Sequence, residues 1–578
     1  MRYFALATDY DGTLAHDGLV NDETIAALEQ LRATGRKLIL VTGRELDDLL
    51  RVFPRLELFD RVVAENGALI YTPATREARP LGDPPPEAFV AALQAQGVAP
   101  LSVGRVIVAT WHPNETVVLK TIRDLGLEHQ VIFNKGAVMV LPPSINKAAG
   151  LGAALSELGL SPHNVVGVGD AENDHAFMSI CECSVAVANA LPMVKERADY
   201  VTRGDHGAGV SELIEIIVAN DLRELQPRIA SGQILLGTRV DARGAEVLMA
   251  AYGVNLLLTG SSGAGKSTLA TAVLERLAAQ GYQFCIIDPE GDYEAFEGAV
   301  TLGDPNRDPS PDAVIELMET SSQNVIVNLL GIALQHRPAF FEQLLPRIQE
   351  LRARTGRPHW LVIDEAHHLL PTSWRPSPST LPQELSGLLL ITVHPDHVAP
   401  AVLSLINTII TVGESPEKGI GAFAEALGQA APDIGPLTLD AGEALVWSRA
   451  PASDTEPGDS APFRLRIAPA SGERRRHSRK YAEGSLGEDK SFYFRGPEQK
   501  LNLRAQNLIL FTQLAEGVDD ETWLYHLRQG DYSRWFRESI KDHDLAAEVE
   551  RFEQQENDAA ESRAAIKAAI EERYTAPA

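Results

Sequence analysis

Short apolar runs alternate with amphipathic stretches over the first 222 residues. The runs that end in polar residues or glycine are Tyr3–Thr8, Leu38–Thr42, Arg61–Ala64 and Val165–Val168. Between the first two, Asp22–Thr34 has the spacing of an amphipathic helix, and Gly35 ends it. This alternation predicts a parallel sheet covered by helices on both faces, with ligands bound at the carboxyl ends of the strands.

The pattern is interrupted after Tyr71. Pro73–Pro86 is rich in proline and charge, Pro86–Gln96 has helical spacing, and strand-like runs follow before Pro142. We interpret residues 72–144 as a cap inserted into a first domain of residues 1–222.

A second α/β pattern runs over residues 233–450 and predicts a second domain. Residues 451–480 have the composition of a linker and contain the basic run Arg474–Lys480, which we expect to be solvated. Residues 481–578 predict a small helical domain with Trp523, Trp535 and Phe536 in its core. We expect its last helix to be a single charged helix over Leu545–Arg573.

Composition narrows the class of protein. A charged fraction of 23% and a mean hydropathy of -0.09, with no apolar stretch near 18 residues, argue against a membrane-spanning protein. The first residues lack the layout of a secretory signal. Three cysteines are too few for a disulfide scaffold and lack zinc-ligand spacing, so we expect them buried in a reducing cytoplasm: Cys181, Cys183 and Cys285. The prediction is a cytoplasmic protein with no membrane partner.

The chain is strongly acidic. Its 52 lysines and arginines against 79 aspartates and glutamates give a net charge of -27. Residues 233–450 alone carry 13 basic and 25 acidic residues, a net of -12. A broad nucleic-acid-binding surface is therefore excluded, and any nucleic acid would have to bind in a local channel.

Two carboxylates, Asp9 and Asp11, directly follow the first apolar run, with Gly12 and Thr13 after them. At a strand end, both can point into one pocket. A carboxylate can act as the nucleophile in phosphoryl transfer, and a neighbouring carboxyl can act as acid to the leaving oxygen and base to the water.

Three further pieces follow in chain order. Thr42 and Gly43, at the end of the second run, offer a hydroxyl and backbone N–H groups to a phosphate. Lys147 offers a cation against developing charge. Further oxygen ligands follow the Val165–Val168 run, at Asp170, Asn173 and Asp174. So many oxygen groups together require a divalent cation, and their chemistry suits Mg²⁺.

These four motifs in order resemble the haloacid dehalogenase (HAD) phosphatases, in particular the Cof-type and sucrose-phosphatase-like branch with a large cap. The resemblance covers residues 1–222 and implies a Rossmann-like domain. It also implies Asp9 as nucleophile and Asp11 as acid/base, with Thr42, Gly43 and Lys147 binding phosphate. The metal ligands that it implies are Asp9, Asp11, Asp170, Asn173 and Asp174. The cap sequence does not identify the substrate.

The second domain carries a phosphate-binding motif. Asn255–Thr259 reads as a strand and Leu269–Gln280 as a helix, and a GxxxxGK[ST] loop lies between them. Its expected ATP-binding residues are Gly260, Ser261, Ser262, Gly263, Ala264, Gly265, Lys266, Ser267 and Thr268. In such loops backbone N–H groups surround the phosphates, the lysine reaches the β/γ oxygens and the serine holds Mg²⁺.

A partner strand lies downstream, where an apolar run from Trp360 ends in Asp364 and Glu365. We expect Asp364 to bind Mg²⁺ through water and Glu365 to polarise the water that attacks ATP. An ABC-type ATPase is excluded, because its signature should precede the Asp-Glu pair and the similar run at 385–387 follows it.

With the run Cys285–Tyr293, these motifs resemble the HerA/FtsK group of ring-forming ATPases over residues 233–450. The resemblance implies acidic residues of the second strand near the nucleotide. It also implies a homo-oligomer, a hexamer in that group, with DNA or protein threaded through a pore. Val393 stands where that group usually has a polar sensor such as glutamine, which leaves Thr392 or His394 to replace it.

The leading hypothesis is a bifunctional enzyme: a Mg²⁺-dependent phosphomonoester hydrolase fused to an ATPase, with Mg²⁺ and ATP as cofactors. Its substrate would be a phosphorylated small molecule or a nucleic-acid end. One alternative is an end-processing enzyme like the polynucleotide kinase–phosphatases. Another is an ATP-gated scaffold whose first domain only binds a phosphorylated ligand.

Overall fold

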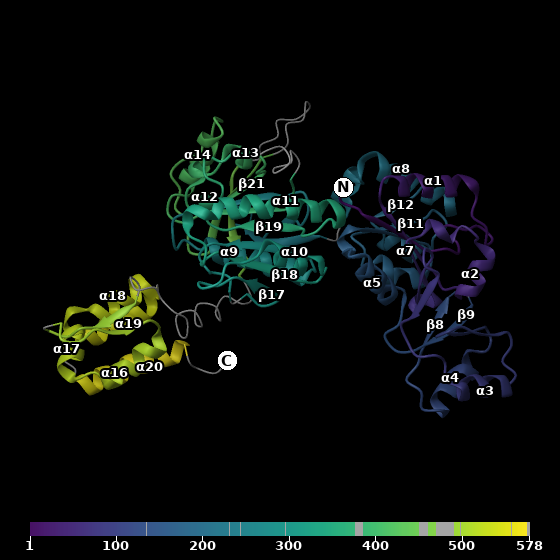
Figure 1. Cartoon of the computed structure of the whole chain (residues 1–578), viewed down its shortest axis with the longest axis horizontal. Helices are drawn as coiled ribbons and strands as arrows, with labels where there is room; N and C mark the ends of the chain where they lie inside the picture. Colours follow the sequence, from purple (N-terminus) through teal and green to yellow (C-terminus); the bar gives the residue numbers. More distant parts are fainter. Residues whose placement is uncertain are drawn as a thin grey trace. The chain divides into compact units, whose positions relative to one another are not determined.

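The computed structural model describes residues 1–134, 136–229, 232–242, 244–294, 296–375, 385–449, 461–469, 491–497, 499–540, 542–555 and 558–574. The chain forms two compact units, Met1–Ala468 and Pro469–Ala578 (Figure 1). The basic run Arg474–Lys480 and most of the predicted linker lie outside the described residues. Within the described part, none of the helices combines the length and apolar character needed to span a membrane.

The first domain is built on an eight-stranded sheet in the order β12-β11-β10-β1-β2-β3-β4-β5. Its strands are β1 (Ala5–Thr8), β2 (Lys37–Val41), β3 (Arg61–Ala64), β4 (Leu69–Thr72), β5 (Glu77–Pro80), β10 (Val165–Gly169), β11 (Cys183–Ala186) and β12 (Tyr200–Val201). The strands from β12 to β3 are parallel, and β4 and β5 are antiparallel additions. The predicted parallel sheet is confirmed, and its carboxyl edge gathers the ends of β1, β2 and β10.

Helices cover both faces of this sheet (Figure 1). They are α1 (Asp22–Ala33), α2 (Leu46–Val52), α5 (Lys147–Leu158), α6 (His175–Met178), α7 (Pro192–Arg197) and α8 (His206–Asn220). Asn146 caps α5, because its side-chain oxygen accepts the N–H of Ala149 at 2.9 Å. This cap makes Lys147 the first helical residue, with its buried side chain at the carboxyl edge of the sheet.

The inserted cap has its own four-stranded antiparallel sheet, β6-β7-β9-β8, and its own apolar core. Its elements are α3 (Glu87–Ala95), β6 (Leu101–Val103), β7 (Val108–Trp111), α4 (Glu115–Asp124), β8 (Gln130–Asn134) and β9 (Ala137–Leu141). The predicted start at residue 72 is wrong, because β5 pairs with β4 and extends the main sheet to Pro80. The cap therefore begins beyond that strand.

The second domain contains an eleven-stranded sheet in the order β14-β13-β23-β22-β21-β15-β20-β19-β16-β18-β17. Its strands are β13 (Gln233–Arg239), β14 (Glu246–Ala250), β15 (Asn255–Gly260), β16 (Phe284–Asp288), β17 (Ala299–Leu302), β18 (Asn324–Asn328), β19 (Trp360–Ile363), β20 (Leu388–Thr392), β21 (Thr408–Val412), β22 (Glu443–Ser448) and β23 (Phe463–Ile467). The strands from β21 to β17 are parallel. The predicted end at residue 450 is wrong, because β23 pairs with β22 and β13 in this sheet.

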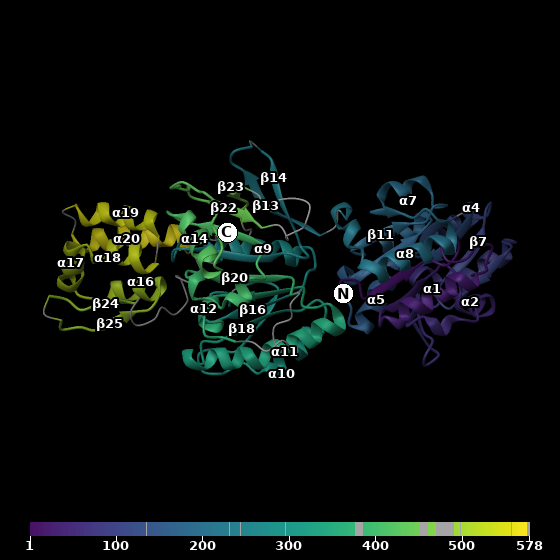
Figure 2. The same cartoon turned by 90° about the horizontal axis from the view of Figure 1, so that it is seen from above.

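Alternating side chains of this sheet enter two cores. Leu256 and Leu258 of β15 pack with α9 (Lys266–Ala279), whereas Leu257 joins the core under α10 (Pro311–Glu319) and α11 (Arg337–Thr355). Figure 2 shows α9 on one face of the sheet and α10 and α11 on the other. The remaining helices are α12 (Ala366–Leu369), α13 (Pro400–Leu403) and α14 (Pro416–Ala426). Both faces are covered, as the continuous apolar strands predict.

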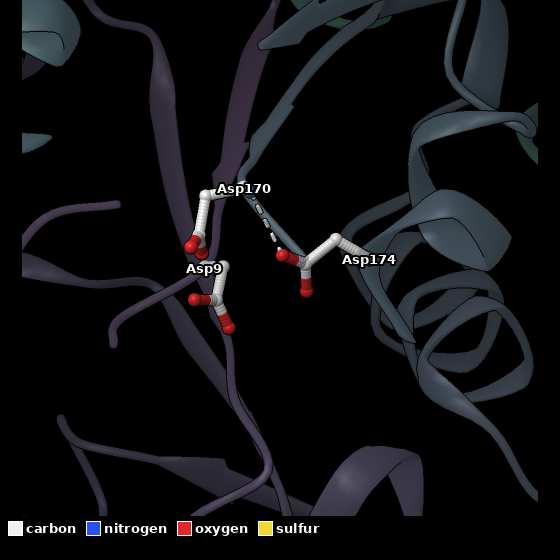
Figure 3. A group of neighbouring side chains, drawn as sticks. All are labelled: Asp9, Asp170 and Asp174. Atoms are coloured by element: carbon white, nitrogen blue, oxygen red, sulfur yellow. Dashed lines mark hydrogen bonds between the residues drawn. The ribbon is translucent and has the colours of Figure 1, made fainter. Parts of the chain in front are cut away.

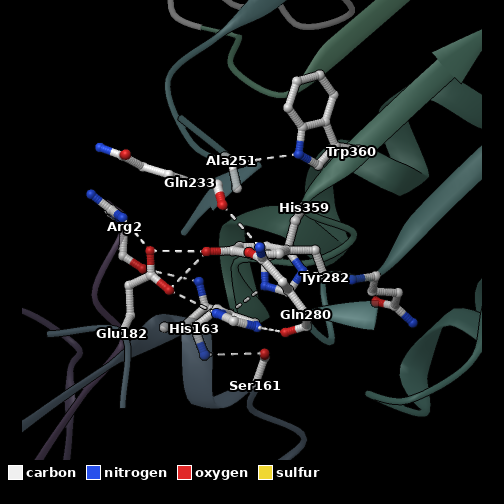
Figure 4. Close-up of polar contacts among 12 residues, drawn as sticks. Arg2, Ser161, His163, Glu182, Gln233, Ala251, Gln280, Tyr282, His359 and Trp360 are labelled. Carbon is white, nitrogen blue, oxygen red and sulfur yellow. Dashed lines mark hydrogen bonds and ion pairs between the residues drawn. The ribbon is translucent and has the colours of Figure 1, made fainter. Parts of the chain in front are cut away.

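The two domains of the first unit contact each other through residues that precede strands (Figure 4). Arg2 lies before β1 and Glu182 before β11, and their side chains form a buried ion pair. Tyr282, before β16, donates its hydroxyl to Glu182 at 2.9 Å. His163, before β10, lies 2.7 Å from Glu182 Oε2 through Nδ1 and stacks on Tyr282 with ring centroids 3.7 Å apart.

A second set of contacts extends this interface. His359, before β19, places Nε2 3.3 Å from Asn164 Oδ1, and Arg357 donates to the Gly159 carbonyl at 2.6 Å. Burial lowers the pKa of His359 well below its usual value, with the nearby His163 adding to the effect. The amino edges of the two parallel sheets therefore contact each other.

The second unit combines a short β-hairpin with helices. Its elements are β24 (Phe492–Phe494), β25 (Leu503–Ala505), α16 (Leu508–Gly517), α17 (Asp520–Gln529), α18 (Asp531–Trp535), α19 (His543–Glu553) and α20 (Ala559–Tyr574). Trp523, Trp535 and Phe536 are buried in its aromatic core, as expected. The single helix expected over Leu545–Arg573 is wrong: α19 ends at Glu553, and Asp558 caps α20 by accepting the N–H of Glu561 at 2.7 Å.

Candidate functional site

Three buried carboxylates meet at the carboxyl edge of the first sheet (Figure 3). Asp9 follows β1, and Asp170 and Asp174 follow β10. One oxygen of each lies within 4.8 Å of the others. Burial and the charge of Asp174 raise the pKa of Asp9 well above its usual value. The arrangement therefore concentrates negative charge in a buried site, where water cannot solvate the three carboxylates.

Lys147 lies inside this cluster. Its ammonium is 2.6 Å from Asp9 Oδ1 and 2.5 Å from Asp174 Oδ1. Burial alone would lower the pKa of Lys147, but the charges of Asp174 and Asp9 outweigh it and raise the pKa. The ammonium is therefore held in its charged form beside Asp9.

Hydrogen bonds and tight packing fix the other acids. Asp174 Oδ2 accepts the backbone N–H groups of Asp170 and Ala171 at 3.0 and 2.9 Å. Thr13 donates its hydroxyl to Asp170 at 3.1 Å. Gly12 has φ +88°, and a Cβ there would lie 2.5 Å from Asp170 Oδ2. The glycine of the Asp-Gly-Thr motif is thus required for the close approach of Asp170.

We expected Asp11 to be a metal ligand, but its side chain is not part of the three-carboxylate cluster of Asp9, Asp170 and Asp174. Its carboxylate forms a bidentate pair with Arg44, at 2.7 Å to Nε and 2.6 Å to Nη2, and Arg44 also pairs with Asp48. Sequence reasoning did not single out Arg44, although it is the last residue of the same Val-Thr-Gly-Arg motif as Thr42. A bidentate guanidinium fixes the orientation of a carboxylate.

The other predicted phosphate-site residues lie beside the cluster. Thr42 is buried at the end of β2, and its hydroxyl oxygen accepts the N–H of Arg44 at 3.1 Å. A Cβ on Gly43 would lie 3.9 Å from Asn173 Nδ2, so this turn approaches the loop after β10. Asn173 Nδ2 itself donates to Asn66 at 3.2 Å. All four sequence motifs therefore meet at one edge of the sheet.

Glu65 joins the main domain to the cap, which the sequence did not reveal. It is buried after β3 in the left-handed region, with φ +51°. Its carboxylate accepts the backbone N–H groups of Arg105, Val106 and Ile107 at 3.0, 2.9 and 3.1 Å. These residues form the cap loop between β6 and β7. The only local signal was an acidic residue directly after a buried strand.

Replacing Glu65 with glutamine should loosen the cap. The amide keeps one acceptor oxygen but turns an NH₂ group toward backbone donors, so we expect a loss of about 2 kcal/mol in the free energy of unfolding. Urea unfolding, followed through loss of phosphatase activity, measures this change. Glu77→Gln on exposed β5 is the control, with an expected change within about 0.5 kcal/mol. Equal midpoints for both variants would contradict the role of Glu65.

The GxxxxGK[ST] loop joins β15 to α9, as predicted. Gly263 and Gly265 have positive φ values of 76° and 97°, and Lys266 begins the helix. The Lys266 ammonium donates to the carbonyls of Gly260 and Ser261 at 3.0 Å each. A Cβ on Gly260 would lie 2.2 Å from the Val412 carbonyl, so this glycine lets β21 approach. Helix-start N–H groups here can bind phosphates.

Asp364 and Glu365 follow β19. Asp364 is buried, and burial together with Asp288 raises its pKa well above the usual value. Glu365 has φ +41°, and burial together with Glu290 raises its pKa. Burial also raises the pKa of Asp288 to about 6, although this carboxylate accepts the N–H groups of residues 290–293. Asp288 thus organises its own turn.

The strand order places β20 between β15 and β19. Its last residue, Thr392, is buried, whereas Val393 is half-buried and His394 is exposed. Two arginines of this domain bind backbone carbonyls near the amino edge of the sheet: Arg352 those of Pro358 and Ser386, and Arg357 that of Met318. These two serve the fold.

Buried carboxylates and one lysine at the carboxyl edge of a capped parallel sheet define a hydrolase of the haloacid dehalogenase class. Residues 6–81 and 112–214 match the haloacid dehalogenase-like hydrolase family. The phosphoglycolate phosphatase of Methanothermobacter thermautotrophicus is 33% identical over 220 residues, which cover 36% of this chain and 96% of that protein. The chain therefore belongs to the haloacid dehalogenase-like hydrolases through its first domain.

Other relatives match the same part of the chain. The phosphoglycolate phosphatase of Haloarcula marismortui is 32% identical over 217 residues, covering 36% of this chain and 95% of its own length. Phosphoglycolate phosphatase 2 of Saccharolobus solfataricus is 28% identical over 223 residues, covering 37% of this chain and 93% of its own length. Residues 252–404 match the AAA domain family. The chain thus joins a haloacid dehalogenase-like hydrolase domain to a second domain that is similar to the AAA domain family.

Proposed function

We propose that the first domain hydrolyses phosphate monoesters through an aspartyl-phosphate on Asp9. The observation that supports this most is the 2.6 Å contact between the Lys147 ammonium and the buried Asp9 carboxylate. A buried carboxylate beside a fixed ammonium is placed to attack a phosphorus atom whose oxygens the ammonium binds.

The reaction has two steps. An Asp9 oxygen bonds to phosphorus as the ester bond breaks, and the leaving alcohol oxygen takes a proton from Asp11. A water that loses its proton to Asp11 then cleaves the aspartyl-phosphate, which restores Asp9 and releases phosphate. Thr42 and the backbone of Gly43 hold the phosphoryl oxygens, and Arg44 orients Asp11.

The residues fit Mg²⁺. With all three acids ionised, Asp9, Asp170, Asp174 and Lys147 sum to a charge of about -2 in a buried place, which a divalent cation balances. Asp9 and Asp170 would hold the ion. Asp174, whose two oxygens accept from Lys147 and from the backbone N–H of Asp170, would position Lys147. Bound there, the cation would supply charge neutralisation to the transferring phosphoryl group.

Metal removal tests this assignment. EDTA should reduce monoester hydrolysis by about 10²-fold or more, and Mg²⁺ should restore it, because several kcal/mol of charge stabilisation are lost. Potassium chloride at the same ionic strength is the control. Mg²⁺ should also raise the unfolding midpoint of the wild type but not of Asp170→Asn. Full activity in EDTA would reject the metal site.

For the substrate, we propose a small phosphorylated carboxylic acid such as 2-phosphoglycolate, as the names of the relatives suggest. Phosphate release from 2-phosphoglycolate, compared with a sugar phosphate and a 3′-phosphorylated oligonucleotide, tests this proposal. A preference for the oligonucleotide would favour an end-processing enzyme instead.

For the second domain, we propose hydrolysis of ATP within a HerA/FtsK-like ring formed by copies of this chain in the cytoplasm. The phosphate loop, Asp364 and Glu365 support hydrolysis, and the three buried free cysteines agree with a reducing compartment. Sizing of the full chain with and without ATP tests the ring: a monomer under both conditions would reject it.

A further inference from the structure

The strand order brings a threonine and a histidine beside the proposed catalytic glutamate. β20 lies between the phosphate-loop strand β15 and the Asp-Glu strand β19, so Thr392 at its end lies between the two motifs. Glu365 leads into the short helix α12, which carries His367. The charge of the Lys266 ammonium acts to lower the pKa of both His367 and Glu365. The group therefore lies at the phosphate end of the loop.

The Nδ1 atom of His367 faces two oxygens. It lies 3.0 Å from Thr392 Oγ1 and 3.3 Å from Glu365 Oε2. Within the described part of the chain, Glu365 Oε2 is buried and makes no hydrogen bond of its own. Thr392 Oγ1 already accepts the N–H of His394 at 3.1 Å, so its hydroxyl proton is available to donate. Only one of the two oxygens can bond to Nδ1 at a time.

Because the neutral His367 imidazole carries only one N–H, its Nδ1 atom can either accept from Thr392 or donate to Glu365, but not both. Burial, with His368, His394 and His397 around it, lowers the pKa of His367 to about 4. The ring is therefore neutral near pH 7 and carries one N–H. When the proton is on Nε2, Nδ1 accepts from the Thr392 hydroxyl. When it is on Nδ1, the ring can donate to the Glu365 carboxylate.

We propose that His367 is a positioning residue for ATP hydrolysis, which fixes the Glu365 carboxylate when the ring proton is on Nδ1 and is donated to Glu365, in place of the tautomer whose Nδ1 accepts from Thr392. The inference rests on the proposed ATPase function. Glu365 then accepts the proton of the attacking water from a fixed position, as the water oxygen bonds to the γ-phosphorus and the bond to the bridging oxygen breaks. Thr392 and His367 together replace the polar sensor that Val393 cannot provide.

Steady-state ATP hydrolysis by the full chain tests this role. His367→Ala should lower kcat by about 10- to 100-fold, the usual cost of losing a group that orients a catalytic residue, with KM within about threefold. His367→Asn, whose amide N–H lies near the Nδ1 position, should recover part of the loss. The matched control is His368→Ala, on the same turn with its ring 4.0 Å from that of His367, and it should change kcat less than twofold.

A double-mutant cycle separates positioning from folding. On a Glu365→Gln background, measured in single turnover, His367→Ala should cost no further rate, because the carboxylate that it positions is gone. A full additional loss, equal losses in the two histidine variants, or a loss confined to KM would overturn the inference. Absence of hydrolysis by the wild type would instead reject the ATPase function itself.

Discussion

Changing Asp9 to asparagine will lower phosphate release from monoesters by about 10³-fold or more, as expected when a covalent nucleophile is lost. The amide is nearly isosteric, so the fold of the buried cluster should persist. It cannot form the acyl phosphate, however, and it removes the charge that Lys147 contacts at 2.6 Å. Malachite-green detection of phosphate from 2-phosphoglycolate measures the change.

The control for this variant is Asp17→Asn. Asp17 lies on the same connection after β1, but its side chain is 92% exposed. It should keep wild-type activity. ATP hydrolysis in Asp9→Asn should also be unchanged. If Asp9→Asn kept phosphatase activity within tenfold of the wild type, another group would attack the phosphorus. If Asp9→Asn lost that activity but the protein still performed its role in the cell, the ATP-gated scaffold would be favoured.

The second large effect concerns Lys266. Replacing it with alanine should lower ATP hydrolysis by about 10²- to 10³-fold, the scale of losing one preorganised donor to a reacting phosphate or oxyanion. The Lys266 ammonium already lies over the loop, bonded to two of its carbonyls. An enzyme-coupled ADP assay measures the rate.

Lys418→Ala provides the comparison, because this exposed lysine of α14 belongs to the same domain. It should hydrolyse ATP at the wild-type rate. The monoesterase activity of Lys266→Ala should be preserved, since the two sites use different sheets. If that activity disappeared as well, the ATPase domain would control the phosphatase and the two reactions could not be treated as independent.

Much of the first site could be predicted because its chemistry is local. Asp9, Thr42 and Asp170 each follow a short apolar run, and parallel strands end at one edge, so strand ends alone bring the motifs together. The role of Glu65 was not predictable in this way. The groups that donate hydrogen bonds to its carboxylate are backbone N–H groups some forty residues away, in a cap loop with no sequence signature.

Other errors have the same physical origin. The strand Phe463–Ile467 follows a stretch with linker composition, and its pairing with β22 and β13 shows that it belongs to the sheet. The ion pair of Asp11 with Arg44 forms because the ends of the paired strands β1 and β2 lie side by side, which neither motif shows by itself. The histidine–threonine contact at Glu365 likewise required the strand order, because residues 367 and 392 are distant in the sequence.

The contact between the amino edges of the two sheets has a consequence for the traffic of small molecules. Each proposed catalytic site lies at the carboxyl end of its strands. The opposite ends of the strands are joined through Arg2, His163, Glu182, Tyr282 and His359. The two centres therefore open away from each other. Over the residues that the structure describes, the shared contact thus separates the two proposed sites, and we expect a product of one reaction to diffuse through bulk solvent before the other site can capture it.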